Sequence, residues 1–178
     1  MMDAREFLTT ILRPGIAWYS GLPGWNVPTD ERAELLMLVI SGTESGWTER
    51  IQSGPTPAAH SFFQMERGGM VTGVLSSAKT KELAGEVCRM MFVAPDAPHA
   101  WGVMATERGD KLAVAFARLG LWLDPHSLPA LADEQGAFDC YVRVWRPGAV
   151  TKGGDRAVQA RDRWHTVYQN AIKAVEGA

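Results

Sequence analysis

The sequence predicts a single, mainly α-helical domain. Apolar residues recur at helical spacing in several segments, no alternating strand of useful length occurs, and 46% of the 178 residues are apolar. A chain of this length is typical of one domain and forms a substantial core. Within that domain we expect an N-terminal helix and loop over residues 1–28, a core over 29–150 and a C-terminal helix over 151–178.

The N-terminal part predicts two helices separated by a loop. The first helix, over 3–13, carries four apolar residues on one face, and we expect it to end at Pro14. The Gly- and Pro-rich stretch over 14–28 indicates an irregular loop. The second helix begins near Thr29 or Asp30, either of which can act as its N-cap. Because the residues that follow are apolar nearly all round, this helix is expected to be buried on most faces.

The remaining helices follow from the same periodicity. We expect helices over 76–94, 109–123, about 130–145 and 154–176. Pro95 and Pro98 are expected to break the chain after the first of these, and Gly68-Gly69 is expected to lie in a loop. The segment near residues 50–70 has room for a small two- or three-stranded β element.

Charge and composition exclude several classes of protein. The formal net charge of -2 argues against a strongly basic nucleic-acid binder, so no nucleic acid is expected as a partner. The four histidines and two cysteines follow no metal-ligand spacing, so neither a metal nor a cofactor is expected. No stretch is long and apolar enough for a membrane span. The N-terminus lacks the basic and apolar regions of a signal peptide, so we expect synthesis in a cytoplasm without export by that route.

Glu44 is the first residue that points to chemistry. It follows the nearly all-apolar helix, where a carboxylate is poorly solvated and its pKa is therefore raised. Such a carboxylate keeps its proton near neutral pH, as a general acid in glycoside cleavage must. Gly42 and Gly46 flank Glu44 and allow another backbone or a substrate to approach closely. The alternative is a helix-end carboxylate that lies in water or pairs with Arg50.

Gln64 lies in a short apolar run about twenty positions further on, Ala59-His60-Ser61-Phe62-Phe63-Gln64-Met65. A buried amide must find hydrogen-bond partners, and in a carbohydrate site it can bind sugar hydroxyls and N-acetyl groups. The sequence Glu44-Ser45-Gly46 followed by this run resembles the lysozyme-like lytic transglycosylases. It is also similar to phage-encoded lysozyme-like proteins, which carry a Gln and a Gly-Pro turn between the two motifs, here Gln52 and Gly54-Pro55.

The resemblance implies a lysozyme-like domain that cleaves the MurNAc–GlcNAc β-1,4 bond of peptidoglycan, with Glu44 as general acid and base. It further implies a cleft between the Gln64 segment and the region of Tyr141 and Trp145, with Tyr141 holding an N-acetyl group or the Glu44 carboxylate. The implied substrate-binding residues are Ser45, Ser61, Gln64, Tyr141 and Trp145. The implied partners are peptidoglycan glycan strands and other virion proteins. The protein would then be virion-associated and act in the periplasm.

Three departures from the family pattern leave alternatives open. Ser61 stands where the family has Gly, Phe62-Phe63 stands where it has Leu-Met, and the family's Tyr-Asn pair near the site is absent. Glu66 is a candidate second carboxylate or else an exposed partner of Arg67. Hydrolases normally need two carboxylates, whereas a single Glu44 suits a transglycosylase that closes a 1,6-anhydro ring. A non-catalytic virion or structural protein with a degenerate site is the second hypothesis, and a helical adaptor without a glycan ligand is the third.

Overall fold

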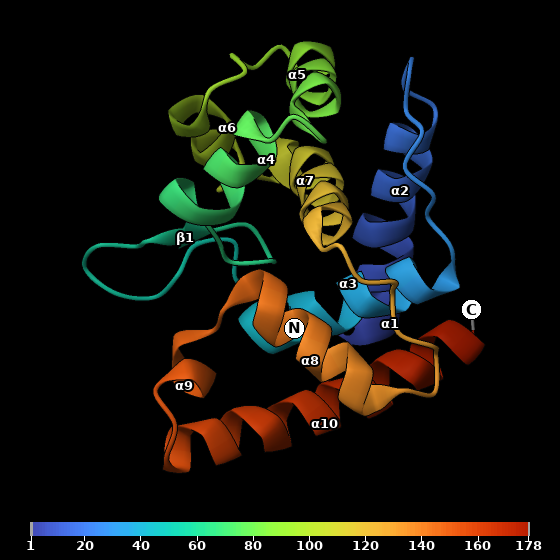
Figure 1. Cartoon of the computed structure of the whole chain (residues 1–178), viewed down its shortest axis with the longest axis vertical. Helices are drawn as coiled ribbons and strands as arrows, with labels where there is room; N and C mark the ends of the chain where they lie inside the picture. Colours follow the sequence, from blue (N-terminus) through green and yellow to red (C-terminus); the bar gives the residue numbers. More distant parts are fainter. Residues whose placement is uncertain (1, 178) are drawn as a thin grey trace.

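Helices make up most of the structure, a computed structural model that describes residues 2–177, and the predicted mainly α-helical class is confirmed (Figure 1). A two-stranded antiparallel sheet is added near the middle of the chain. The helices are α1 (Ala4–Phe7), the π-helix η1 (Leu8–Leu12), α2 (Arg13–Ser20), α3 (Glu31–Ser45), the π-helix η2 (Arg67–Val71), α4 (Thr72–Ser76), α5 (Lys81–Met90), α6 (Ala97–Val103), the 3-10 helix η3 (Glu107–Gly109), α7 (Asp110–Leu123), α8 (Glu134–Trp145), α9 (Gly148–Thr151) and α10 (Asp155–Glu176).

The first helix does not end at Pro14, and this prediction is wrong. Helical structure runs from α1 through η1 into α2 and ends at Ser20, so the irregular segment is shorter than 14–28. Pro14 lies in the first turn of α2, directly after the π-helix η1, where the regular hydrogen-bond ladder is already interrupted and the missing N–H is tolerated. In the π-turn before Pro14, the Arg13 N–H donates a hydrogen bond to the Leu8 carbonyl, and this wider turn joins α1 to α2 without a break. Gly15 then allows α2 to approach Val114 on α7 closely.

Helix α3 is the central element, as its apolar sequence predicts. Asp30 caps it by accepting hydrogen bonds from the N–H groups of Arg32 and Ala33. All its residues from Leu35 to Thr43 are buried, and it contacts η1, α1, α7 and α10. Helix α3 ends at Gly46, whose φ of 62° places it in the left-handed region typical of a C-cap. Glu44 thus lies in the last turn of a buried helix.

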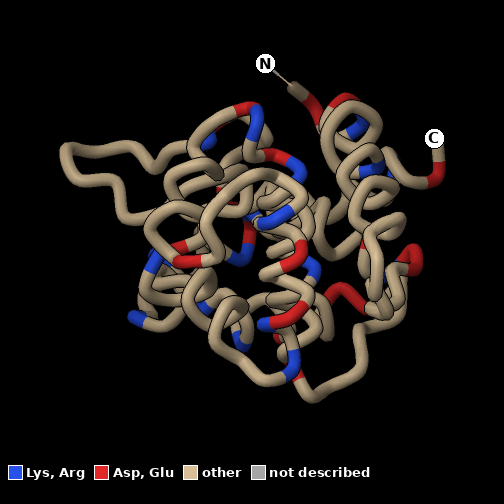
Figure 2. The backbone as a smooth tube through the Cα atoms, turned by 90° about the horizontal axis from the view of Figure 1, so that it is seen from above, with Lys and Arg blue, Asp and Glu red and all other residues tan. Residues whose placement is uncertain are grey.

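The predicted β element is a two-stranded hairpin. Strands β1 (Ala59–His60) and β2 (Met65–Glu66) pair antiparallel, with Ala59 opposite Glu66 and His60 opposite Met65. A single bridge joins Ile51 to His60. The uncharged loop before β1 projects from the body of the molecule (Figures 1 and 2). Figure 2 also shows that positive and negative residues are interspersed along most of the chain.

Five short helical segments of the described chain were not predicted: η2, α4, α6, η3 and α9. Gly68 and Gly69 lie in η2, which leads into α4, and residues 148–151 form α9. Pro98 lies in the first turn of α6, where proline starts a helix instead of breaking it, and Asp96 caps that helix through the His99 N–H. In contrast, α5, α7, α8 and α10 fall within or close to their predicted ranges. Over residues 2–177, no helix has both the length and the apolar character that crossing a bilayer demands.

Candidate functional site

A groove of about 1410 Å³ runs beside the C-terminal end of α3. One wall is formed by the hairpin, η2 and the start of α4, and the other by α8, α9 and the first half of α10. In Figure 1 the hairpin and α4 lie above this region and α8 to α10 lie below it. Small-molecule pockets usually enclose about 300–1,000 Å³, so the groove suits an extended ligand.

Glu44 and Tyr141 meet in this groove. The Tyr141 hydroxyl donates a hydrogen bond of 2.6 Å to Oε1 of Glu44, and both residues line the groove. The Tyr141 ring is buried and stacks on Trp164 of α10 with ring centroids 4.9 Å apart. Because this stacking restricts the phenol, the hydroxyl holds one carboxylate oxygen in a defined place. Holding the Glu44 carboxylate is one of the two roles expected for Tyr141. The two residues lie 97 positions apart in the sequence and meet only in the fold.

The surroundings of Glu44 raise the pKa of its carboxyl. Burial raises the pKa of its carboxyl to about 6, the negative charge of Glu66 adds to the increase, and the Tyr141 hydrogen bond and the charge of Arg163 oppose it. Arg50, the alternative partner, instead forms two hydrogen bonds of 2.8 and 2.9 Å to Asp110. Glu44 is therefore a partly buried carboxyl that gains and loses a proton close to neutral pH.

Gln64 has a role in shaping the loop between the strands. Its φ of 47° is in the left-handed region, and its Nε2 donates to the carbonyls of Ser61 (2.9 Å) and Glu49 (3.1 Å). Both bonds use the amide nitrogen, so the amide oxygen is available as an acceptor in the groove that Gln64 lines. Trp145 fixes the same loop from the other wall, because its Nε1 donates to the Phe63 carbonyl at 2.8 Å.

Ser45 and Ser61 are placed in the protein interior. The Ser45 hydroxyl donates to the Ser41 carbonyl at 2.8 Å, and the fully buried Ser61 hydroxyl accepts from the Phe63 N–H at 3.2 Å. Neither residue lines the groove. Their position does not support direct contact with a glycan, because local backbone groups already use both hydroxyls.

Glu66 faces the same groove from β2. It is exposed, and within residues 2–177 no ion pair joins it to Arg67 or to another cation. Arg67 instead lies over the ring of Trp101, 5.8 Å from its centroid. The structure thus brings together Glu44, Gln64, Glu66, Tyr141 and Trp145 around one groove.

Arg163 is a site residue that the sequence analysis missed. Its guanidinium lies 3.8 Å from the position that a Cβ on Gly46 would occupy, and its charge acts on Glu44. The one signal in the sequence is that Arg156 and Arg163 lie seven positions apart in a predicted helix, which places them on the same face. Nothing in the sequence shows that this face of α10 meets the end of α3.

Gly42, one of the two glycines beside Glu44, differs from expectation in what it allows to approach the helix. A Cβ on Gly42 would lie 2.3 Å from the ring of Trp47 and 2.7 Å from Val167. Gly42 therefore allows the protein's own side chains, and not a substrate, to approach α3. Trp47 is fixed there by a hydrogen bond of 3.1 Å from its Nε1 to the Leu38 carbonyl.

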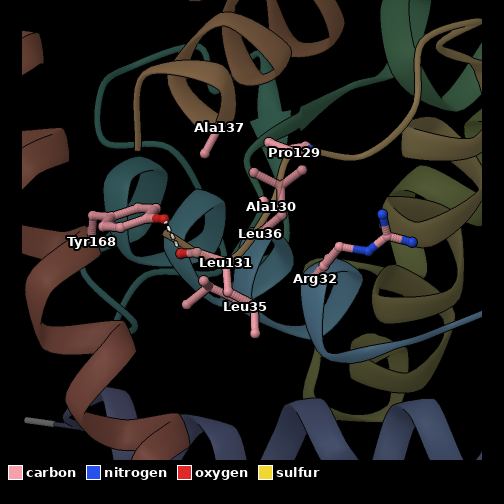
Figure 3. A pocket seen from close by; sticks show the side chains of 8 residues that line it. All are labelled: Arg32, Leu35, Leu36, Pro129, Ala130, Leu131, Ala137 and Tyr168. Atoms are coloured by element: carbon pink, nitrogen blue, oxygen red, sulfur yellow. Dashed lines mark hydrogen bonds between the residues drawn. The ribbon is translucent and has the colours of Figure 1, made fainter. Parts of the chain in front are cut away.

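A second, much smaller void lies beside the N-terminal half of α3 (Figure 3). It measures about 10 Å³, room for about one water, and mostly apolar side chains of α3, α8 and the segment 129–131 line it. Tyr168 closes it through a hydrogen bond of 2.5 Å to the Leu131 carbonyl. Its size makes it a packing defect. No group of three or more His, Cys, Asp or Glu side chains suited to a metal ion occurs between residues 2 and 177.

The chain matches no known protein-family model, and it matches no curated protein or solved structure at a significant level.

Proposed function

We propose that the protein cleaves the β-1,4 bond between MurNAc and GlcNAc in peptidoglycan, with Glu44 as general acid and base. The observation that carries this proposal is the Glu44 carboxyl, with its raised pKa, held at 2.6 Å by Tyr141 in a groove large enough for a polymer. The resemblance of the Glu44-Ser45-Gly46 and Gln64 motifs to lysozyme-like lytic transglycosylases supports the same substrate.

Glu44 has the properties that each proton-transfer step requires. In the first step the protonated carboxyl gives its proton to the glycosidic oxygen as the bond to that oxygen breaks. The carboxylate that remains accepts the Tyr141 hydrogen bond, which stabilises its charge. It then takes a proton from the incoming hydroxyl, and either the muramic C6 hydroxyl or a water can be that nucleophile.

The anhydro-forming reaction is the better fit to the carboxylates present. A hydrolase that uses a second carboxylate needs it close to the bond being cleaved. Glu66, the other carboxylate of this groove without a cationic partner among the described residues, lies exposed on the opposite wall, and its charge acts on Glu44, but the anhydro-forming reaction does not require it. In the anhydro-forming reaction Glu44 alone performs both proton transfers, and Gln64 offers its amide oxygen to the sugar.

A non-catalytic virion or structural protein is the second candidate. The specific observation in its favour is Ser61, which replaces the family's Gly and is held at a φ of 69° inside the loop that carries Gln64. Such a protein would keep the groove and bind glycan without turnover. Under either proposal the protein is phage-encoded and virion-associated, and it meets the cell wall in the periplasm.

Digestion of purified peptidoglycan by wild type, Glu44→Gln and Glu66→Gln tests the proposal. We expect wild type to release soluble muropeptides and Glu44→Gln to lose about 10²–10⁴-fold in rate, because the substitution removes the proton donor. Products lighter than the hydrolytic ones by the mass of one water identify the anhydro-forming reaction. Glu66→Gln is the matched control and should retain most activity. Binding of all three proteins to peptidoglycan without release of products would favour the non-catalytic candidate.

A further inference from the structure

Three arginines without an acidic partner line one wall of the groove. These are Arg146 at the end of α8, and Arg156 and Arg163 on α10. Within residues 2–177 none of them forms an ion pair, whereas Arg143, a fourth arginine of the groove, bonds to Asp124 at 2.8 Å. Arg163 donates one long hydrogen bond of 3.4 Å to the Gly42 carbonyl, and its other N–H groups, like the guanidinium groups of Arg146 and Arg156, are available to bind an anion.

The helix geometry places these charges in a row. Arg156 and Arg163 are seven residues apart, so they lie on one face of α10 and about 10 Å apart along its axis. Gln159 and Ala160, between them on that face, also line the groove. Arg146 adds a charge from α8 and adopts a left-handed φ of 50° at the C-cap of that helix. Two elements therefore converge to give a positive wall beside Glu44.

The opposite wall has a different character. Among the described residues, Glu66 is the one charged residue that the hairpin, η2 and α4 contribute to the groove, and its neighbours are Gln52 and the glycines of η2 and α4; Asp124, which follows α7, is paired with Arg143. The chain as a whole carries a net charge of -2, so the positive wall is a local feature and not a consequence of a basic composition. Arginine is the side chain best suited to bind carboxylates, because its planar fork matches them with two parallel hydrogen bonds.

We propose, on the basis of the proposed function, that Arg146, Arg156 and Arg163 bind the carboxylates that peptidoglycan carries on its muramic acid residues. The groove would then select an anionic glycan over an uncharged one of the same backbone, such as chitin. The carboxylates come from two sources, the stem peptides of intact peptidoglycan and the lactyl groups that are freed when those peptides are removed.

Binding by Glu44→Gln, which avoids turnover, separates these sources. Three ligands are compared: soluble intact peptidoglycan fragments, the same strands stripped of peptides by an amidase, and chitin oligosaccharides. In the Glu44→Gln background, the Arg146→Gln/Arg156→Gln double variant is measured against Arg89→Gln. The control removes an exposed arginine of α5, which does not line the groove.

We expect the double variant to bind the anionic ligands at least about tenfold more weakly, because it loses two charge-assisted contacts. Its affinity for chitin oligosaccharides and the affinities of Arg89→Gln should be unchanged. Added salt should weaken the binding of anionic ligands by the parent protein more than their binding by the double variant. A loss confined to intact fragments assigns the wall to stem peptides, and a loss confined to stripped strands assigns it to lactyl groups.

Equal affinity of parent and double variant for every ligand would overturn the inference, as would an equal loss on chitin. Cleavage of peptidoglycan by the wild-type protein is measured in parallel. If wild type cleaves and the double variant binds normally, only the role of the arginines fails. If the parent binds no glycan and wild type cleaves none, the proposed function itself fails.

Discussion

On one wall of the groove, α8 and α10 pack aromatic side chains behind Glu44 of α3, whereas the opposite wall consists of a short hairpin and the glycines of η2 and α4. Tyr141 and Trp164 stack behind the first carboxylate, and burial raises its pKa to about 6. Glu66 on the second wall is exposed. The two glutamates that face this groove thus differ in burial, because only Glu44 has a packed core behind it.

The two walls of the groove therefore make different contributions to the site. The helical wall desolvates the Glu44 carboxyl and supplies the positive charge of Arg163 that acts on it, while the hairpin wall provides Glu66 and a loop shaped by Gln64 and fixed by Trp145. A change to the packing behind Glu44 should therefore alter both stability and chemistry. A change on the hairpin wall should alter the fit of a ligand more than the proton transfer.

Substituting Gly42 should produce the largest loss of stability. In Gly42→Ala the new Cβ meets the Trp47 ring at 2.3 Å, so α3 and its neighbours must move apart. Overpacking of this kind costs about 1–3 kcal/mol. Gly85→Ala on α5 is the control: nothing lies within 4 Å of its Cβ, and we expect no loss or a gain of up to about 1 kcal/mol. Urea unfolding of both variants measures this, and equal stability of the two would show that the packed wall tolerates displacement.

Removing the charge of Glu44 should stabilise the protein at neutral pH. The pKa in the folded protein is about 6 against 4.5 for the ordinary carboxyl, so the folded state binds the proton more tightly than the unfolded state. The resulting contribution to stability is present below pH 4.5 and is lost as the pH rises to 6. Glu44→Gln should therefore be more stable than wild type by about 2 kcal/mol at pH 7.

Unfolding of Glu44→Gln and wild type at pH 7 and at pH 4 measures that effect. The difference between the two proteins should shrink toward zero at the lower pH. A difference that does not depend on pH would mean that the Glu44 carboxyl titrates normally in the fold.

On the hairpin wall, Gln64→Ala should cost about 1–2 kcal/mol of unfolding free energy. It removes two hydrogen bonds to backbone carbonyls from a residue in the left-handed region. We also expect a higher KM on peptidoglycan with a smaller change in kcat, because the loop shapes the groove but does not transfer protons. A large fall in kcat at unchanged KM would place Gln64 in the chemical step.

The smallest expected effect is a shift in pH dependence caused by Tyr141→Phe. The Tyr141 hydroxyl lowers the pKa of Glu44 by donating a hydrogen bond to the carboxylate, so its loss should raise that pKa further. Activity requires the protonated acid, and the alkaline limb of the rate profile should move upward from near pH 6 by the same amount. An unchanged alkaline limb in Tyr141→Phe would show that Tyr141 does not influence the group whose titration limits the rate.

The elements that could be predicted from sequence are those with a strong local signal. The apolar run behind Asp30 predicts a buried α3, and the periodicity of α7 and α10 predicts their ranges. The predictions that Pro14 and Pro98 interrupt helices are wrong because the effect of proline depends on its position in a helix. Pro14 and Pro98 both lie in first turns, which a local pattern alone does not reveal.

The site was predictable only in its local parts. Glu44 and Gln64 stand out because each is a polar group within an apolar run. Tyr141 entered through the resemblance, but its bond to Glu44 depends on how α8 packs against the end of α3. Arg163 was missed because the register between α10 and α3 is set by contacts such as that of Val167 at Gly42, far apart in the sequence.

The most direct test of the central claim is the rate at which wild type and Glu44→Gln release soluble muropeptides from peptidoglycan between pH 4.5 and 8. The account predicts release by wild type with an alkaline limb near pH 6, set by the raised pKa of Glu44, and almost none by Glu44→Gln at any pH. Equal release by the two proteins, or no release by wild type across the whole range, would contradict it.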